Sequence, residues 1–155
     1  MQPELKLTAS QEDYLEAIYN ISRSRLAARG KDIAGYLGVG PSSVTGALKA
    51  LGEMKLINYA PYDFVTLTDY GRSVAEDIAG RHNTLEYFLI KVLGIEKKAA
   101  SEAACIMEHN IPGPIVERLK KYSEYVDSSM KAGITWKSGF GYYCKNGCLK
   151  PDRKN

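Results

Sequence analysis

Hydrophobic residues recur at helical spacing along most of this chain of 155 residues, with short polar segments between the runs. The first run predicts an amphipathic helix over residues 10–22, with Ser10 as its N-cap and Asp13 in the capping-box position. Its buried side is expected to consist mostly of Tyr14, Leu15, Ile18, Tyr19 and Ile21.

The second half of the chain also has a helical pattern. A long helix is expected over residues 69–92, capped by Thr68 and stopped by Gly94. Two more helices are expected over residues 96–110 and 115–126, and the last 28 residues show no helical period. The pattern predicts a mainly α protein.

Between these two regions, two short helices adjoin a glycine-containing turn. The first covers residues 31–37 and ends at Gly38, and the second begins at Pro41, which suits a first helical position. One face of the second helix is apolar and carries Val44, Leu48 and Leu51. The arrangement is typical of a helix-turn-helix, in which the second helix enters the major groove of DNA.

The opposite face of that second helix is small, polar or cationic. Together with an arginine just before the motif, it supplies the candidate DNA-binding residues Arg29, Pro41, Ser42, Ser43, Thr45, Gly46 and Lys49. After Lys55 the pattern changes to a period of two around a turn at residues 61–63, which predicts a hairpin. A hairpin at this place indicates a winged helix-turn-helix, and the alternative is an ordinary helical pair followed by a hairpin.

Charge and composition narrow the class of protein only slightly. Residues 128–155 contain six Lys or Arg and one Asp, so the rest of this chain of net charge +3 is slightly acidic. Phosphate contacts are better predicted by the local cluster Arg23, Arg25, Arg29 and Lys31, although a solvated loop would have the same composition.

Three features bear on the cellular location. No apolar run approaches the roughly 18 residues of a membrane helix, and the N-terminus resembles no export signal. Three cysteines fit a reducing environment better than a disulfide scaffold. We therefore expect a cytoplasmic protein with no membrane partner.

Potential metal ligands occur at helical spacing. Cys105, Glu108 and His109 stand at i, i+3 and i+4, so that thiolate, carboxylate and imidazole project from one side of a helix. Such mixed donors suit a divalent first-row transition metal. Two further pairs, each spaced for one helix face, are Asp13 with Glu16 and His82 with Glu86. Each residue taken alone has a purely structural explanation, but together they favour a metal site.

Several segments, in this order and spacing, resemble the diphtheria-toxin-repressor family of metal-activated bacterial and archaeal transcription regulators. The similarity covers residues 8 to about 126 and is carried by SQEDYLEAIY, DIAGYLGVGPSSVTGALKALGEMKLINY, VTLTDYGRSVA, RHNTLEYFL and EAACIMEH. The resemblance implies a winged helix-turn-helix domain over residues 1–70 and a metal-binding, dimerisation domain over 71–127, followed by a basic tail over 128–155. Larger members of the family continue into an SH3-like domain, for which we expect no room in 155 residues.

The resemblance also implies roles for the metal-ligand candidates. Cys105, Glu108 and His109 match primary-site ligands, and the cysteine follows the iron-sensing branch. Asp13 and Glu16 follow the manganese-sensing branch instead, which makes the donor set a hybrid. We therefore expect Fe2+ or Mn2+ as the effector, with Co2+, Ni2+ or Zn2+ also able to bind in vitro.

A second metal site is implied by His82 and Glu86. Ser101 stands where iron-sensing members carry a histidine of that site, so Glu102 or water would have to replace it. Cys144 and Cys148 in the tail could complete a zinc site only with a second chain, and the alternative is a flexible tail with incidental thiols.

The resemblance predicts a mechanism and its partners. Ligands from both domains would let the metal fix one domain against the other, in a homodimer that binds a roughly palindromic operator in double-stranded DNA. Two alternatives remain: a winged-helix regulator with a non-metal effector, and a small metal-dependent hydrolase. No HExxH-type motif supports the enzyme, so the prediction is a repressor that is not an enzyme.

Overall fold

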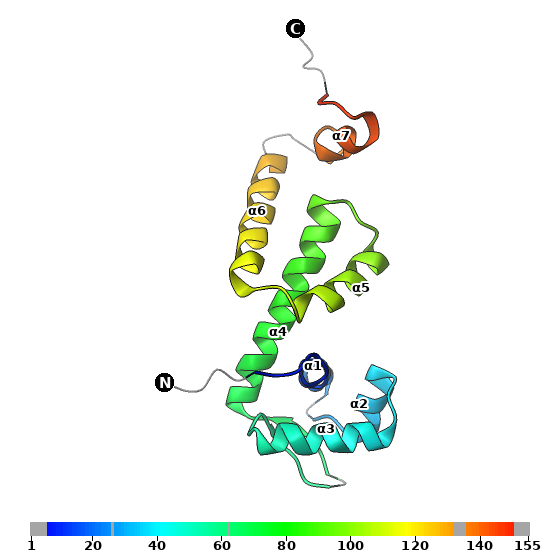
Figure 1. Cartoon of the computed structure of the whole chain (residues 1–155), viewed down its shortest axis with the longest axis vertical. Helices are drawn as coiled ribbons and strands as arrows, with labels where there is room; N and C mark the ends of the chain where they lie inside the picture. Colours follow the sequence, from blue (N-terminus) through cyan, green and yellow to red (C-terminus); the bar gives the residue numbers. More distant parts are fainter. Residues whose placement is uncertain (1–5, 26, 62, 132–135, 151–155) are drawn as a thin grey trace. The chain divides into compact units, whose positions relative to one another are not determined.

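The computed structural model describes residues 6–25, 27–61, 63–131 and 136–150, and it is mainly helical (Figure 1). The chain divides into two compact units, Met1–Ala79 and Gly80–Asn155, with the boundary inside a helix. The elements in chain order are α1 (Ala9–Ser24), α2 (Gly30–Leu37), α3 (Pro41–Glu53), β1 (Ile57–Asn58), β2 (Thr66–Leu67), α4 (Asp69–Tyr87), the π-helical turn η1 (Phe88–Val92), α5 (Lys97–Glu108), α6 (Gly113–Lys131) and α7 (Phe140–Asn146).

Helix α1 begins earlier than its sequence pattern suggested. Thr8, not Ser10, is the N-cap: the Gln11 N–H donates to Thr8 Oγ1 at 3.2 Å, and the Thr8 N–H donates to Gln11 Oε1 at 2.9 Å. The predicted cap was wrong, because Ser10 lies inside the helix and the reciprocal pair forms between Thr8 and Gln11. The buried face of α1 includes Leu15 and Ile18, as predicted.

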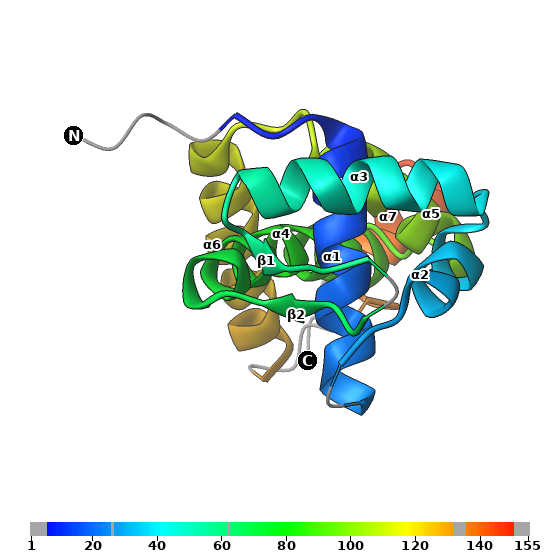
Figure 2. The same cartoon turned by 90° about the horizontal axis from the view of Figure 1, so that it is seen from below.

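Helices α2 and α3 confirm the predicted helix-turn-helix. Helix α2 ends at Gly38, whose φ of 66° closes it in the left-handed conformation, and Pro41 is the first residue of α3. The predicted apolar face of α3 is buried in the core of the first unit and consists of Val44, Leu48 and Leu51. Figure 2 shows α3 running beside the hairpin.

The hairpin is also confirmed, with shorter strands than expected. Strands β1 and β2 are antiparallel, with Ile57 opposite Leu67. A bridge between Ala28 and Val65, which the sequence pattern did not indicate, adds a third segment from the loop before α2. The fold therefore ties the wing to the start of the helix-turn-helix.

The end of the hairpin is joined to α4 through Thr68. As predicted, Thr68 caps α4: its Oγ1 accepts the Gly71 N–H at 2.9 Å. The same hydroxyl donates to the Lys55 carbonyl at 2.8 Å, while the Thr68 N–H donates to the Leu56 carbonyl at 3.0 Å. Gly71 packs so tightly on the Leu56 backbone that a Cβ at this position would collide with the carbonyl oxygen.

In the second unit, α4 follows the predicted path, but its last turn is the π-helical η1, and Gly94 with φ 68° terminates it. Helix α6 packs beside η1, where the rings of Phe88 and Tyr122 lie 6.4 Å apart. The Tyr87 hydroxyl donates to Asp127 Oδ2 at 2.6 Å. This hydrogen bond, with slight burial and the negative charge of Asp127, raises the pKa of Tyr87 above its ordinary value.

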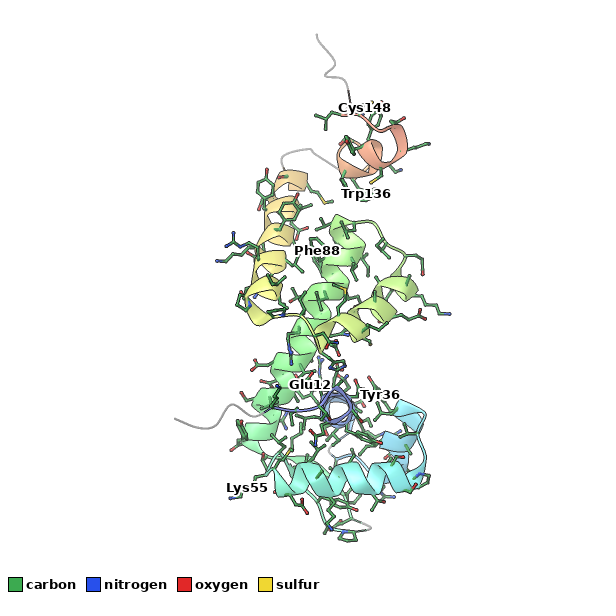
Figure 3. The ribbon with its side chains drawn as sticks, in the orientation of Figure 1. Glu12, Tyr36, Lys55, Phe88, Trp136 and Cys148 are labelled. Carbon is green, nitrogen blue, oxygen red and sulfur yellow. The ribbon has the colours of Figure 1, made fainter. Side chains whose placement is uncertain are left out.

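The prediction that the last 28 residues lack helical structure is wrong for part of them, because α6 runs to Lys131 and α7 forms later. The Trp136 indole, labelled in Figure 3, packs against Gly94 and Gly141. A Cβ at either glycine would collide with the indole. It also meets the Phe140 ring edge-on at 5.6 Å between centroids. Trp136 therefore packs both against α7 and against Gly94, 42 positions before it in the chain.

In the part of the chain that the structure describes, none of the helices is both long enough and apolar enough to cross a bilayer.

Two glycines of α4 give opposite expectations for the same substitution. Gly71→Ala should lower the free energy of unfolding by about 1–3 kcal/mol, because the new methyl group would displace the Leu56 backbone. Gly80→Ala, where no neighbouring atom lies within 4 Å, should raise it by about 0.5–1 kcal/mol through helix propensity. Urea unfolding followed by circular dichroism, at one fixed protein concentration, measures both. Equal effects of the two substitutions would contradict the tight packing at Gly71.

Candidate metal centre and nucleic-acid surface

Helix α3 presents one continuous polar face to solvent. We call this the α3 polar face; it is exposed throughout and consists of Pro41, Ser42, Ser43, Thr45, Gly46 and Lys49. The Thr45 hydroxyl donates to the Pro41 carbonyl at 3.1 Å, and no atom lies within 4 Å of a Cβ built on Gly46. Small side chains over almost two turns leave the helix backbone open to close approach, which suits a groove of DNA.

A cationic loop precedes the helix-turn-helix in the same unit. Arg29 is exposed and directly precedes α2, and its backbone N–H donates to Asp32 Oδ2 at 3.2 Å. Asp32 also pairs with Arg25 at 3.3 Å. The sequence pattern missed Phe64, which lies 4.5 Å beneath the Arg29 guanidinium; an exposed aromatic in a predicted wing was the only available signal.

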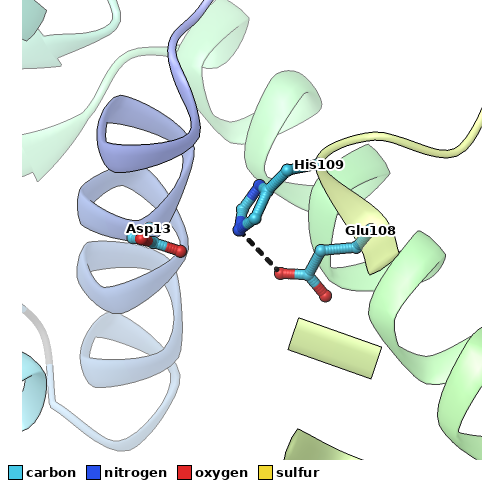
Figure 4. Close-up of side chains that lie close together, drawn as sticks. All are labelled: Asp13, Glu108 and His109. Atoms are coloured by element: carbon cyan, nitrogen blue, oxygen red, sulfur yellow. Dashed lines mark ion pairs between the residues drawn. The ribbon is translucent and has the colours of Figure 1, made fainter. Parts of the chain in front are cut away.

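In the second unit, four potential ligands come together from two helices. We call them the Glu108 cluster: His82 on α4, Cys105 and Glu108 on α5, and His109 at the C-cap of α5. His82 Nδ1 lies 2.6 Å from Glu108 Oε2 and 3.8 Å from Cys105 Sγ. Figure 4 shows the ion pair on the other side of the carboxylate, where His109 Nε2 lies 3.6 Å from Glu108 Oε1.

The carboxylate at the centre of the cluster is almost completely enclosed. The Glu108 side chain is 1% exposed, against 15% for His82 and 9% for His109. Within the described residues, Glu108 Oε1 has no hydrogen-bond partner, since the His109 nitrogen is in ion-pair range but beyond hydrogen-bond length. A buried carboxylate oxygen without a hydrogen bond is costly, so this atom is suited to a cation.

The donor chemistry of the cluster fits the metals that the sequence suggested. Two imidazoles, a carboxylate and a thiol offer nitrogen, oxygen and sulfur donors. Divalent first-row transition metals accept such a mixture, whereas ions that bind only oxygen do not. Arg81 also supports the cluster, because its guanidinium donates to the Glu108 backbone carbonyl at 3.0 Å at the end of α5. No spacing rule had pointed to Arg81.

The other predicted ligands lie on helices whose bounds are now known. Asp13 and Glu16 are one turn apart on α1, in the first unit. Glu86 follows His82 by one turn on α4, and Ser101 precedes Cys105 by one turn on α5. The helical spacing had paired His82 with Glu86, whereas the fold brings His82 to Glu108, 26 positions away.

Comparison with protein families gives two matches, which together span most of the chain. Residues 6–65 match the N-terminal DNA-binding domain of iron-dependent repressors. Residues 68–136 match the metal-binding and dimerisation domain of the same repressors.

Individual proteins that are similar to this chain are also transcriptional regulators. An uncharacterized HTH-type transcriptional regulator of Methanocaldococcus jannaschii is 40% identical over 119 residues, which are 76% of this chain and 95% of that protein. The HTH-type transcriptional regulator MntR of Bacillus subtilis is 31% identical over 120 residues, 77% of this chain and 84% of that one.

Solved structures are similar to about the same part of the chain. A manganese-dependent transcriptional repressor in complex with manganese has a TM-score of 0.69 and 28% identity, over 74% of this chain and 53% of that one. The IdeR protein of T. acidophilum has a TM-score of 0.66 and 25% identity, over 77% of this chain and 55% of that one. The chain thus spans about half the length of these two structures.

The enclosed carboxylate leads to a prediction about metal affinity. Glu108→Gln should lower the affinity for Co(II) at least about 100-fold. Substitution of residues that only support the ligands already lowers metal affinity about 10- to 100-fold, and loss of a ligand should cost at least as much. Titration monitored by the visible absorption of Co(II) measures the affinity. Glu117→Gln, at an exposed position on α6, is the matched control and should leave it unchanged. Wild-type affinity in Glu108→Gln would show that the carboxylate binds no metal.

Proposed function

The chain belongs to the diphtheria-toxin-repressor family of metal-dependent, DNA-binding transcriptional repressors, and we propose that Fe(II) or Mn(II) activates it to control genes of metal homeostasis. The observation that carries the proposal is the Glu108 cluster, with its buried and incompletely paired carboxylate. Its place of action is the cytoplasm, where DNA and reduced thiols occur together.

The proposed ligand set starts from this cluster. Cys105, Glu108 and His109 would hold the activating metal, with His82 beside them in the second unit. The family resemblance adds Asp13 and Glu16 from α1, and it assigns Glu86 with His82 to a second site. Support from this chain's own geometry is strongest for the residues around Glu108.

The protein side of the mechanism is a matter of charge and protonation. Glu108, Asp13 and Glu16 carry like charges, and each carboxylate repels the others when they approach. Both imidazoles must be neutral and the Cys105 thiol ionised before they can act as ligands. When bound, the metal supplies the positive charge that makes convergence of these groups favourable. Ligands from both units would then favour one arrangement of the DNA-binding unit over others.

The proposed DNA surface consists of the α3 polar face and Arg29. Ser42, Ser43 and Thr45 would contact phosphates and base edges, while Lys49 and Arg29 would contact phosphates. The helix backbone at Pro41 and Gly46 leaves room for that approach. A homodimer formed through the second unit would present two such surfaces, matched by a palindromic operator with half-sites about 34 Å apart or a multiple of that distance.

An operator-binding titration tests the function. The metal-loaded protein first selects duplexes from a random-sequence library, and one selected duplex is then titrated with protein in the presence of Fe(II) (anaerobic), Mn(II), Co(II) or Zn(II). We expect high affinity only with metal, and the selected sequences should be roughly palindromic. Equal affinity with metal and with chelator would favour a regulator with another effector.

The α3 polar face leads to a prediction for the same assay. Replacing Ser43 and Thr45 together with alanine should weaken binding to the selected duplex about tenfold, since each lost hydrogen bond costs about 0.5–1.5 kcal/mol. Metal affinity should stay as in the wild type, because α3 contributes no proposed ligand. Unchanged DNA affinity in the double variant would move the recognition surface elsewhere.

The thiol of Cys105 leads to a prediction about metal choice. Manganese prefers oxygen donors, whereas a thiolate favours softer or more strongly binding ions, so Cys105→Glu should raise the response to Mn(II) relative to Fe(II) severalfold. The ratio of the two activation midpoints in the DNA-binding assay measures this effect. Cys144→Ser, at an exposed position on α7, is the control and should leave the ratio unchanged. An unchanged ratio in Cys105→Glu would mean that Cys105 is not a ligand.

A further inference from the structure

Arg29 and Phe64 form a pair on the surface of the first unit that no proposed role of the wing explains. The Arg29 guanidinium carbon lies 4.5 Å from the centroid of the Phe64 ring, well within the range of a cation–π contact. Phe64 is 49% exposed, and a large apolar side chain left so open to solvent calls for an explanation. The two residues lie 35 positions apart in the chain.

Their pairing follows from strand register. Ala28 and Val65 are bridge partners that exchange both backbone hydrogen bonds, at 3.1 and 2.8 Å. In an antiparallel pair the next position along, Arg29 opposite Phe64, is a non-hydrogen-bonded pair, where side chains approach most closely. The register cannot slip by one residue, because Ala28 and Val65 are both fully buried and a shift would expose them.

Both backbones are held at this point by further contacts. The Arg29 N–H is accepted by Asp32 Oδ2, and the Phe64 N–H is accepted by Asp63 Oδ1 at 2.7 Å. The guanidinium therefore lies over the ring on the solvent side of a fixed backbone pair. A flexible arginine normally loses rotamer freedom on binding, and a ring beneath it removes part of that cost in advance.

The surroundings of the pair are cationic. Arg25, Lys31 and Asp32 line the same recess as Arg29 and Phe64. Asp32 is engaged by Arg25 at 3.3 Å and by the backbone of Arg29, so three positive side chains share the recess with one negative one. Such a surplus next to a helix-turn-helix suits the DNA backbone, whose phosphates accept planar guanidinium groups in pairs of hydrogen bonds.

We propose that Phe64 is a positioning residue of the DNA interface, which holds the Arg29 guanidinium at a backbone phosphate by stacking beneath it. This inference rests on the proposed function, since it assumes that the first unit binds DNA. It gives the wing a role through a side chain that need not touch DNA. It also predicts that the role concerns affinity for the phosphate backbone and not the choice of sequence.

A double-mutant cycle on metal-saturated protein tests the proposal. Duplex affinity is measured between about 50 and 200 mM salt for the wild type and for Phe64→Leu, Arg29→Ala and the double variant. Arg29→Ala should reduce the salt slope by about 0.9, the value of one lost phosphate contact. Phe64→Leu should weaken binding about two- to fivefold, the size of an exposed cation–π contact. The double variant should bind no worse than Arg29→Ala alone.

Three further variants separate positioning from general damage to the wing. Phe64→Tyr keeps the ring and should retain wild-type affinity, whereas Arg29→Lys keeps the charge without the planar group and should resemble Phe64→Leu. Tyr70→Leu removes an aromatic of similar exposure, 46%, from α4 and should leave the salt slope unchanged. The selected duplex and an unselected duplex of equal length should lose affinity by the same factor.

The outcomes are distinct. If the effects of Phe64→Leu and Arg29→Ala multiply in the double variant, or if Arg29→Lys binds as tightly as the wild type at every salt concentration, Phe64 does not act through Arg29 and the proposal is overturned. The proposed function fails separately, if metal leaves the DNA affinity of the wild type unchanged. In that case the cycle can still be measured on the unselected duplex. A wild type that binds neither duplex overturns both.

Discussion

The carboxylate of Glu108 is the group around which the proposed metal site of the second unit is arranged. It is enclosed, and its two oxygens face two imidazoles from different segments, His82 on α4 and His109 at the end of α5. Burial of a charge is unfavourable unless the charge is paired, so the fold must keep both segments in place for as long as Glu108 stays ionised. The same requirement makes the cluster receptive to a cation. A structural constraint and a binding property therefore arise from one residue.

In the first unit a comparable role belongs to the backbone contacts that tie the wing to the helices. The bridge between Ala28 and Val65 connects the wing to the loop before α2, and Thr68 connects the end of the hairpin to the start of α4. The α3 polar face is presented by a helix whose other side is packed in the core beneath these contacts. The proposed DNA surface thus depends on residues that need not touch DNA themselves.

The proposed donor set mixes hard and soft ligands. In the donor set that we propose, the oxygen donors Asp13 and Glu16 would favour a different metal from the Cys105 thiol. A regulator with such a set would be expected to tune its response through the protonation and softness of a few side chains, with the scaffold unchanged. The agreement with relatives in both matched domains indicates that the scaffold is shared.

Local periodicity determined much of this structure. The helix-turn-helix, the wing, the Thr68 cap and the stop at Gly94 could all be predicted, because each depends on residues within a few positions of one another. Spacing within one helix likewise grouped Cys105 with Glu108. The misplaced N-cap of α1 was an error of the same local kind, since Ser10 is a good cap in isolation.

Tertiary structure alone decided the contacts between distant segments. His82 meets Glu108 across 26 positions, Arg29 meets Phe64 across 35, and α7 forms where Trp136 packs against Gly94. Hydrophobic periodicity cannot encode such pairs, because it reports which face of an element is buried and not what that face meets. Which residues could serve as ligands was therefore visible in the sequence. Which of them share one enclosed carboxylate was settled only when α4 packed against α5.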